Sequence, residues 1–345
     1  MTDRSSSHVV LAAMDKFRGT ASARELSDAV ARAARSAGAQ ADVQPMSDGG
    51  EGFRDAFDGD EVTVEVPGPL GETVSAGITV NESPAGTRAV LEVAEVLGRE
   101  RLASPTRDEA LRASSEGAGH LILAAQRLGV ASILFGCGGS ATSDGGLGCY
   151  QVLQDAGGLS VPVVVATDVT ARFSGLKRYA RQKGIDPHDL AVLDRRLERA
   201  RELYLNERGV DVELLDRAGA SGGIPGALAA LGATLTGGFD AVAHAVSLGE
   251  RIGAASLVVT GEGRFDGGSL EGKVVVGVAH LARTAPLLVL CGSIDDASAD
   301  AFTRRFAHVH LVSLVRRFGA RRARTRVIEC VELAVTEEVR LLAPG

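Results

Sequence analysis

Short apolar runs that lead into polar loops and then into amphipathic helices recur near both ends of this 345-residue chain. Val9–Ala13 is the first such run, and a capping box of Ser22 and Glu25 then begins a helix with apolar residues at helical spacing. Val43–Met46 is the next expected strand. An order of strand, loop and helix is typical of a parallel α/β sheet. The same order returns after residue 256, with elements expected at Leu257–Thr260, Val274–Arg283, Leu287–Leu290 and Val309–Leu314.

The middle of the chain has a different pattern. A helix is expected from Ser104-Pro105 through Ala124, followed by a strand at Ser132–Phe135. We therefore predict an α/β domain formed by residues 1–61 and 257–345, and an inserted α+β domain formed by residues 62–256. The inserted domain is expected to open with an antiparallel meander, because three strand-like runs are separated only by Pro/Gly turns: Val62–Val66, Thr73–Val80 and Arg88–Ala94.

The composition is that of a globular protein with an excess of glycine. Hydrophobic residues make up 45 % and charged residues 23 % of the chain, which are ordinary shares. The 43 glycines gather in short loops, where the backbone turns sharply or approaches a ligand. The formal net charge of −7 disfavours a nucleic-acid partner, which would need a broad basic face. The basic run Arg316–Arg326 is expected to form a loop and a solvated helix start.

The cysteines and the apolar runs predict a cytoplasmic protein. Cys137, Cys149, Cys291 and Cys330 form no CxxC pair, so neither a disulfide framework nor a zinc site is indicated. Val9–Met14 is too short for a signal peptide, and no run reaches the roughly 18 apolar residues of a membrane helix. The sequence does not indicate an oligomeric state.

The strongest chemical feature is the glycine loop at residues 136–146, which directly follows an expected strand. Free backbone N–H groups in such a loop can surround phosphate oxygens. Gly138 and Gly139 would supply such groups, and Ser140 and Thr142 would add hydroxyl donors. Asp144 could hold Mg²⁺, which usually needs only one or two carboxylates besides phosphates and water. So many glycines beside an acid and two hydroxyls favour a ligand site over a simple turn.

Two further acid–glycine loops are expected at residues 48–52 and 260–266. Both follow expected strands, at the edge where open α/β sheets bind ligands. Lys16 and Arg18 precede the capped helix, which is a natural anion site, although two surface cations are equally expected from spacing alone. Residues 267–274 nearly match the phosphate loop GxxxxGK[ST], but a valine replaces the hydroxyl, so the match is treated as chance. Lys273 could still meet an anion at the following helix N-terminus.

These loops together resemble the bacterial glycerate kinases of the first type across nearly the whole chain. The resemblance implies phosphorylation of D-glycerate that depends on ATP and Mg²⁺, with 2-phosphoglycerate a more common product than the 3-phosphate. It also implies a flavodoxin-like domain made of both chain ends, with a second domain inserted. The matching stretches are Asp15–Thr20, Pro45–Gly52, Gly138–Gly146, Gln182–Gly184, Gly219–Gly223 and Thr260–Asp266.

Binding roles follow from in-line phosphoryl transfer, in which catalysis comes mainly from positioning and charge neutralisation. The backbone of Gly138–Thr142 would hold the nucleotide phosphates, and Asp144 and Glu262 would hold the metal. Arg18 and Lys183 would meet the substrate carboxylate or the transferred phosphate. The other expected substrate-binding residues are Lys16, Glu51 and Lys273.

The catalytic base is left open among three acids. Asp48 or Asp266 would accept the proton of the substrate hydroxyl, and Asp168 is a third candidate. The sequence does not choose among them.

The chain departs from the family pattern at four places. It has Arg18 in place of a lysine, Gly268 in place of a glutamine, a shortened segment before Thr167-Asp168-Val169, and residues 170–173 in place of an Asp-Asn-Pro-Leu stretch. Arginine keeps the charge of lysine but not its shape at a phosphate. Two alternatives to a glycerate kinase are therefore kept: a kinase for another small hydroxy or sugar acid, and a non-catalytic homologue that binds a ligand.

Overall fold

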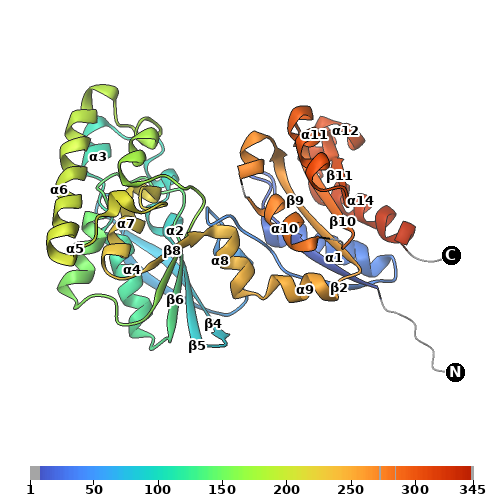
Figure 1. Cartoon of the computed structure of the whole chain (residues 1–345), viewed down its shortest axis with the longest axis horizontal. Coiled ribbons are helices and arrows are strands. Elements are labelled where there is room, and N and C mark those ends of the chain that lie inside the picture. The colour runs from blue at the N-terminus through green and yellow to red at the C-terminus, as the bar shows by residue number, and fades with distance from the viewer. Residues whose placement is uncertain (1–7, 272, 284, 343–345) are drawn as a thin grey trace. The chain divides into compact units, whose positions relative to one another are not determined.

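The computed structural model describes residues 8–271, 273–283 and 285–342, and these form two compact units (Figure 1). Unit 1 comprises the chain up to Asp48 and from Val242 onward, and unit 2 comprises Gly49–Ala241. These bounds differ from the predicted domain bounds at both places where the chain passes from one unit to the other. Residues 49–61 group with unit 2 because Arg54 is ion-paired to Glu61 and to Glu95 there. Residues 242–256 group with unit 1, where helix α9 packs on strand β1.

Unit 1 is built on a five-stranded sheet in which all strands are parallel. The order is β2-β1-β9-β10-β11, which is 2-1-3-4-5 along the chain and is the flavodoxin-like order. The predicted fold class is thus confirmed for this unit. Its strands are β1 (Val9–Met14), β2 (Gln40–Val43), β9 (Leu257–Phe265), β10 (Leu287–Ile294) and β11 (Val309–Ser313). Its helices are α1 (Ala23–Ser36), α9 (Leu248–Ala254), η8 (Gly267–Glu271), α10 (Val274–Ala282), α11 (Asp296–Arg305), α12 (Leu314–Phe318), α13 (Ala320–Thr325) and α14 (Val327–Leu342).

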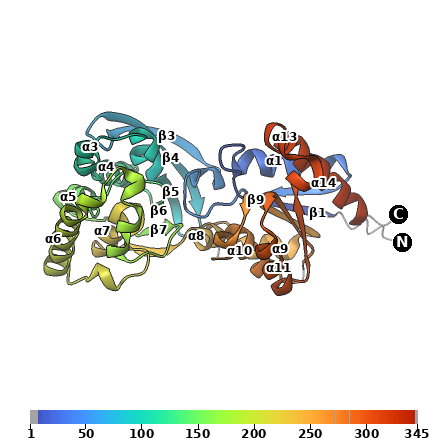
Figure 2. The same ribbon diagram turned by 90° about the horizontal axis from the view of Figure 1, so that it is seen from above.

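Helices cover both faces of this sheet, α1 and α14 on one side and α9, α10 and α11 on the other (Figure 2). Helix α1 begins as predicted, because the Ser22 side chain accepts a hydrogen bond from the Glu25 N–H while Glu25 reaches back to the Ser22 N–H. The apolar face of α1 packs against α14, with Leu26, Val30 and Val331 fully buried between helix and sheet. Burial of this kind supplies most of the stability of such a layer.

Three predicted elements of unit 1 have different bounds. β9 continues to Phe265, which pairs with Ile294, so most of the loop predicted at residues 260–266 is strand. β2 lies at Gln40–Val43, ahead of the predicted Val43–Met46, although the N–H groups of residues 44 and 46 still donate to β1 carbonyls. The basic run forms the short helices α12 and α13, where a loop and a solvated helix start were predicted.

Unit 2 is built on a six-stranded sheet with the order β3-β4-β5-β6-β7-β8. The predicted meander is confirmed, because β3, β4 and β5 pair antiparallel. From β5 to β8 the pairing is parallel, so the unit is a mixed sheet with helices packed on it. The strands are β3 (Asp60–Pro67), β4 (Thr73–Ser83), β5 (Gly86–Glu92), β6 (Ser132–Gly136), β7 (Val163–Thr167) and β8 (Thr234–Gly237). The α-helices are α2 (Val93–Leu97), α3 (Arg107–Arg112), α4 (Glu116–Arg127), α5 (Leu147–Asp155), α6 (Leu190–Arg208) and α7 (Ile224–Ala230). The chain returns to unit 1 within α8 (Gly238–Ala245).

Unit 2 has two apolar cores. One lies between the sheet and helices α2, α4, α5 and α7. The other lies under α6, where Leu193, Leu197 and Tyr204 are buried with Phe173. No helix within the described part of the chain is long and apolar enough to cross a membrane.

The helix predicted from residue 104 to residue 124 is two helices, α3 and α4, with a break at residues 113–115. Thr106 caps α3 in a capping box with Glu109. The break has a long-range cause, because the N–H and the hydroxyl of Ser115 both donate to Asp144 Oδ2, at 2.9 and 2.7 Å. The Ser115 hydroxyl in turn accepts from the Cys149 N–H at 3.0 Å. Ser115 thereby joins the start of α4 to the glycine loop and to α5.

We expect Ser115→Ala to lower the free energy of unfolding by about 1–3 kcal/mol, because a buried carboxylate loses a donor and a buried N–H loses its acceptor. The midpoint of urea unfolding, followed by circular dichroism, measures the change. Ser75→Ala, at an exposed position on β4, is the matched control and should leave the midpoint unchanged. Equal midpoints for the two variants would contradict this account of the break.

Candidate functional site

The strand register of unit 1 gathers acidic residues at the carboxyl edge of its sheet. Met14 at the end of β1 pairs with Gly261, and Glu262 pairs with Cys291 of β10. Asp15 follows Met14 directly, and its N–H donates to the Gly261 carbonyl at 3.1 Å. Parallel strands thus place Asp15 and Glu262 at one edge, which is where ligands bind in open α/β sheets.

These two carboxyl groups are buried and their pKa values are raised. Asp15 is 6 % exposed and Glu262 is 8 % exposed. Burial raises the pKa of Asp15 to about 6, against the lowering effect of Lys16, and the nearby Asp48 raises it further. Burial likewise raises the pKa of Glu262 to about 7, with Ser269 and Lys273 opposing it. In both groups removal from water outweighs the neighbouring cations.

Lys16 lies between the two aspartates of this edge. Its Nζ is 3.5 Å from Asp48 Oδ1 and 3.9 Å from Asp15 Oδ1. Burial alone would lower the pKa of Lys16, but the two carboxylates outweigh burial and raise it. We call Asp15, Lys16, Asp48, Glu262 and Lys273 the acidic cluster of unit 1. This cluster therefore brings together four of the predicted site residues: Lys16, Asp48, Glu262 and Lys273.

The other predicted residues of unit 1 lie at the surface. Arg18 is exposed, although its charge still acts on Lys16. Asp266 follows β9 with its side chain 42 % exposed, 3.2 Å from Arg264 Nε. Its Oδ1 accepts the N–H of Gly268 at 3.0 Å. Asp266 therefore stabilises the turn before α10, and its role as a base stays a prediction.

Unit 2 has a carboxyl edge of its own. The register aligns Glu92 with Gly136, Gly136 with Ala166, and Ala166 with Thr236, so the ends of β5, β6, β7 and β8 lie side by side. The glycine loop leaves β6 at this edge. Asp168 directly follows β7 and is exposed. This edge is the second place where a ligand is expected to bind.

Asp144 fixes the glycine loop. Besides the two bonds from Ser115, its carboxylate accepts the N–H of Gly146 at 3.1 Å and that of Gly148 at 3.2 Å. The stretch Gly219–Gly223 packs against the same loop, because Gly145 N–H donates to the Gly222 carbonyl at 2.9 Å. Asp144 thus has a structural role in this geometry, and its metal-binding role stays a prediction.

Lys183 lies beneath the same loop. Its Nζ donates to the Thr142 carbonyl at 2.7 Å and to Ser140 Oγ at 3.4 Å. The side chain is buried, which lowers the pKa of Lys183 to about 8 despite the raising effect of Asp144. Thr142 Oγ1 and Ser143 Oγ are buried and have no hydrogen-bond partner among residues 8–271, 273–283 and 285–342. An ammonium group beside two unsatisfied hydroxyls is a set of donors suited to an anion.

The loop at residues 49–52 packs against the glycine loop within unit 2. A Cβ built on Gly138 would lie 2.7 Å from Gly50 Cα and 3.3 Å from Asp168 Oδ1. Only glycine, which has no Cβ, allows the two loops to approach this closely at position 138. Glu51 is exposed, and Gly139 is exposed beside the buried Ser140. The structure thereby groups Gly138, Ser140, Thr142, Lys183 and Asp168.

The described residues contain no group of three or more histidine, cysteine, aspartate or glutamate side chains that could hold a metal ion. Mg²⁺ bound together with phosphates needs fewer protein ligands than that. Glu262 fits this requirement, because its buried Oε1 has no hydrogen-bond partner in the described ranges. In contrast, both carboxylate oxygens of Asp144 already accept hydrogen bonds from the protein.

Sequence reasoning missed four residues at these edges as site residues. Asp15 was seen only as part of a matching stretch, and Ser143 only as part of the glycine loop. Arg99 donates its N–H to the Gly139 carbonyl at 3.1 Å and a guanidinium N–H to Gln182 at 3.1 Å, and its charge lowers the pKa of Lys183. Glu92 is a buried acid at the end of β5. Single charged residues at strand and helix ends give no sequence signal.

We expect Gly138→Ala to lower the free energy of unfolding by about 1–3 kcal/mol, because the added methyl group overlaps Gly50 and the loops must separate. The urea midpoint is the measurement. Gly249→Ala in α9 is the control, since its Cβ would meet nothing within 4 Å among the described residues, and helical alanine is slightly stabilising. A Gly138→Ala midpoint equal to that of the unmodified protein would contradict the close contact.

Comparisons with known proteins agree with the α/β fold. The chain is 35% identical over 329 residues to the "Glycerate 2-kinase" of Escherichia coli strain K12, covering 83% of this chain and 86% of that protein. It is 32% identical over 331 residues to the "Glycerate kinase" of Bacillus subtilis strain 168, covering 84% and 86%. A crystal structure from Salmonella typhimurium LT2, described as "putative glycerate kinase 2", superposes with a TM-score of 0.78 at 28% identity and covers 97% of this chain and 98% of that one. The model of the Glycerate kinase family matches residues 10–157 and 155–327, and the chain belongs to this family.

Proposed function

We propose that this protein transfers the γ-phosphoryl group of ATP to the 2-hydroxyl group of D-glycerate, giving 2-phosphoglycerate. Membership of the Glycerate kinase family supports phosphorylation of glycerate. The observation that carries the proposal is the buried set of donors at the glycine loop, Lys183 with the hydroxyls of Thr142 and Ser143. Phosphoryl transfer is catalysed mainly by positioning and by neutralising charge, and these groups supply positive charge and hydrogen-bond donors.

The glycine loop is assigned to the nucleotide phosphates. The backbone of Gly138 and Gly139 and the hydroxyls of Ser140 and Thr142 would donate to phosphate oxygens. Lys183 would meet the transferred phosphoryl group or the substrate carboxylate from below the loop. Most of its water contacts are already lost in the folded protein, so its charge acts strongly on an anion that reaches it.

The acidic cluster of unit 1 is assigned to the metal. Glu262 would hold Mg²⁺ through its unsatisfied Oε1, with Asp15 as a buried neighbour. The ion would supply charge neutralisation on the phosphate oxygens. Lys16 and Lys273 offset the like charges of the acids in this cluster, so the cluster has both acidic and basic groups for a metal and an anion.

Coupled measurement of ADP release with purified protein tests the function. D-glycerate, L-glycerate and a panel of small hydroxy and sugar acids serve as acceptors, and conversion of the product by enolase identifies the 2-phosphate. We expect turnover with D-glycerate that requires Mg²⁺. Turnover with another acid alone would replace the substrate, and a thermal shift without any turnover would favour a non-catalytic binding protein.

The catalytic base is tested by Asp48→Asn, Asp266→Asn and Asp168→Asn. A base contributes roughly 10²- to 10⁴-fold to the rate, so we expect one variant to lose kcat by that factor with a smaller change in KM. We propose Asp48, because its carboxylate is 12 % exposed and faces Lys16, whereas Asp266 is engaged in a turn. Normal kcat in Asp48→Asn, with a loss in either of the others, would move the role to that residue.

Substrate affinity is expected to depend on the protonation of Lys183. Its lowered pKa of about 8 means that the ammonium form is present below pH 8 and is lost above it. Binding of D-glycerate, whose carboxylate stays ionised, should therefore weaken roughly tenfold between pH 7 and pH 9. Isothermal titration calorimetry measures this. Lys183→Arg is the control, because arginine stays charged throughout, and its affinity should be flat with pH. A flat profile in the unmodified protein would exclude Lys183 as the partner of the substrate carboxylate and leave it only the transferred phosphoryl group.

A further inference from the structure

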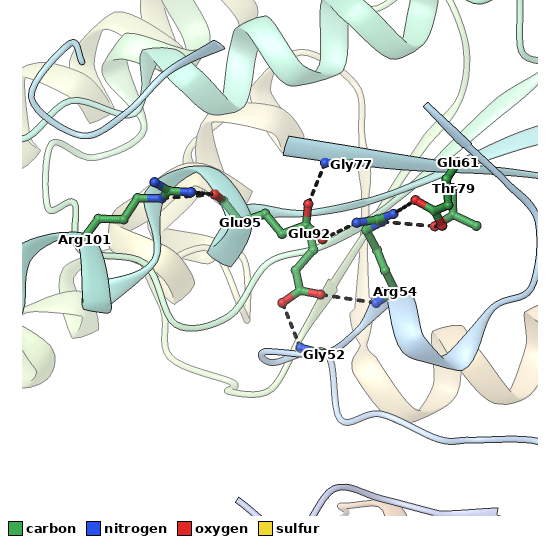
Figure 3. A network of polar contacts seen from close by, with 8 residues as sticks. All are labelled: Gly52, Arg54, Glu61, Gly77, Thr79, Glu92, Glu95 and Arg101. Carbon is green, nitrogen blue, oxygen red and sulfur yellow. Dashed lines mark hydrogen bonds and ion pairs between the residues drawn. The ribbon is translucent and has the colours of Figure 1, made fainter. Parts of the chain in front are cut away.

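Glu92 is a buried acid that contacts the backbone of the loop next to the glycine loop. It ends β5 and is 5 % exposed. Its Oε1 accepts the N–H of Gly52 at 2.8 Å, and its Oε2 accepts the N–H of Arg54 at 3.2 Å (Figure 3). One carboxylate thus holds two backbone groups of the segment that follows residues 49–51.

The ionised form of Glu92 is unfavourable in this position. Burial raises its pKa to about 7, and Glu95 and Asp55 raise it further, while the two backbone bonds lower it. An apolar side chain at the same place would avoid that penalty. A buried acid with such a pKa is therefore a candidate for a functional role.

A second anchor holds the same segment from the other side. The Arg54 guanidinium donates to Thr79 Oγ1 at 3.0 Å and is ion-paired with Glu61 and Glu95. Glu95 is itself fixed, because it accepts the Gly77 N–H at 2.7 Å and its carbonyl accepts from Arg101. Figure 3 shows this network reaching from the loop to strands β3 and β4 and to helix α2. Residues 52–54 are consequently fixed to the sheet of unit 2.

The anchored segment determines where residues 49 and 50 lie. Gly50 Cα would be 2.7 Å from a Cβ on Gly138, and a Cβ on Gly49 would lie 3.1 Å from the carbonyl carbon of Thr167. Gly138 and Asp168 belong to the proposed site, and Asp168 directly follows Thr167. A shift of the loop by about 1 Å would therefore move or release two parts of that site, and displacements of this size can reduce a rate 10²-fold.

We infer that Glu92 is a positioning residue: through the N–H groups of Gly52 and Arg54 it holds the loop at residues 49–52 against Gly138 and Asp168 in the geometry that phosphoryl transfer requires. This role rests on the proposed function. Glu92 acts through the loop backbone, by the two hydrogen bonds that its carboxylate accepts from Gly52 and Arg54.

The test is Glu92→Gln, which keeps the shape of the side chain. The amide oxygen can still accept one N–H, but the amide NH₂ faces the other N–H and cannot accept it. We expect kcat to fall roughly 10- to 100-fold, the effect of losing one charge-assisted bond, with KM for ATP changed less than threefold. Thermal stability should be retained, because a buried charge is removed together with the bond. A purely structural residue would lower stability and leave kcat of the folded protein unchanged, and that result would overturn the inference.

Asp211→Asn is the matched control. Asp211 accepts the Glu213 N–H at 3.1 Å and pairs with Arg201 at 2.7 Å, so it likewise holds a backbone segment of unit 2, and it is not one of the proposed site residues. We expect a lower melting temperature with kcat within twofold of the unmodified protein. A loss of kcat as large as that of Glu92→Gln would overturn the inference, since any lost anchor would then have the same effect.

Hydrogen–deuterium exchange provides a readout that is independent of turnover. Glu92→Gln should speed exchange of the amides of residues 50–54 at least tenfold and leave the α6 amides unchanged. Glu92→Asp, which keeps the charge but is one methylene shorter, should speed the same amides and lose kcat as well. Unchanged exchange in both variants would overturn the anchor even if glycerate turnover is present. If the unmodified protein shows no turnover while the Glu92 variants alter exchange as expected, the proposed function is wrong. Glu92 would then hold the loop without a role in catalysis.

Discussion

Asp144 accepts hydrogen bonds that fasten the glycine loop of unit 2 to the rest of that unit. Its two oxygens bind the N–H and hydroxyl of Ser115 and the N–H groups of Gly146 and Gly148. These donors stand at or beside the starts of α4 and α5, so one side chain joins the loop to two helices. Bonds to an ionised group are stronger than neutral ones, more so when buried. The position of Lys183, which bonds to the loop carbonyl of residue 142, depends on this arrangement.

Four of the ionisable groups at the two sheet edges share one electrostatic property. Burial moves the pKa of Asp15, Glu92 and Glu262 upward and that of Lys183 downward, so each is pushed toward its neutral form. Each would be replaced by an apolar residue if stability alone decided. Their concentration at carboxyl edges, and not over the core at large, is what an anion and metal site would produce.

The order of the elements was predictable because its signals are local. The capping box at Ser22 and the apolar periodicity of α1 lie within one helix, and the Pro/Gly turns of the meander lie between its strands. The extension of β9 to Phe265 was not predictable, because its glycines are typical of a loop and only pairing with β10 makes them strand. The break before α4 has the same origin, since Asp144 is distant in sequence from Ser115.

The candidate site was predictable to a similar extent. Residues inside motifs, such as Lys183 and Thr142, were found because several unusual residues stand together. Glu92 and Arg99 were missed because each is a single charged residue whose partners come from other segments. The unit bounds were misplaced for the same reason, because the pairing of Arg54 with Glu61 and Glu95 assigns residues 49–61 to unit 2.

The departures from the family pattern lie mostly outside the buried groups. Arg18 is exposed, Gly268 donates its N–H to Asp266, and Phe173 fills the core under α6. These positions affect the surface, a turn and packing. A homologue that only bound an anion would need the donors around Lys183 but would gain nothing from Glu262, whose buried oxygen has no partner among the described residues. The presence of both groups favours phosphoryl transfer over binding alone.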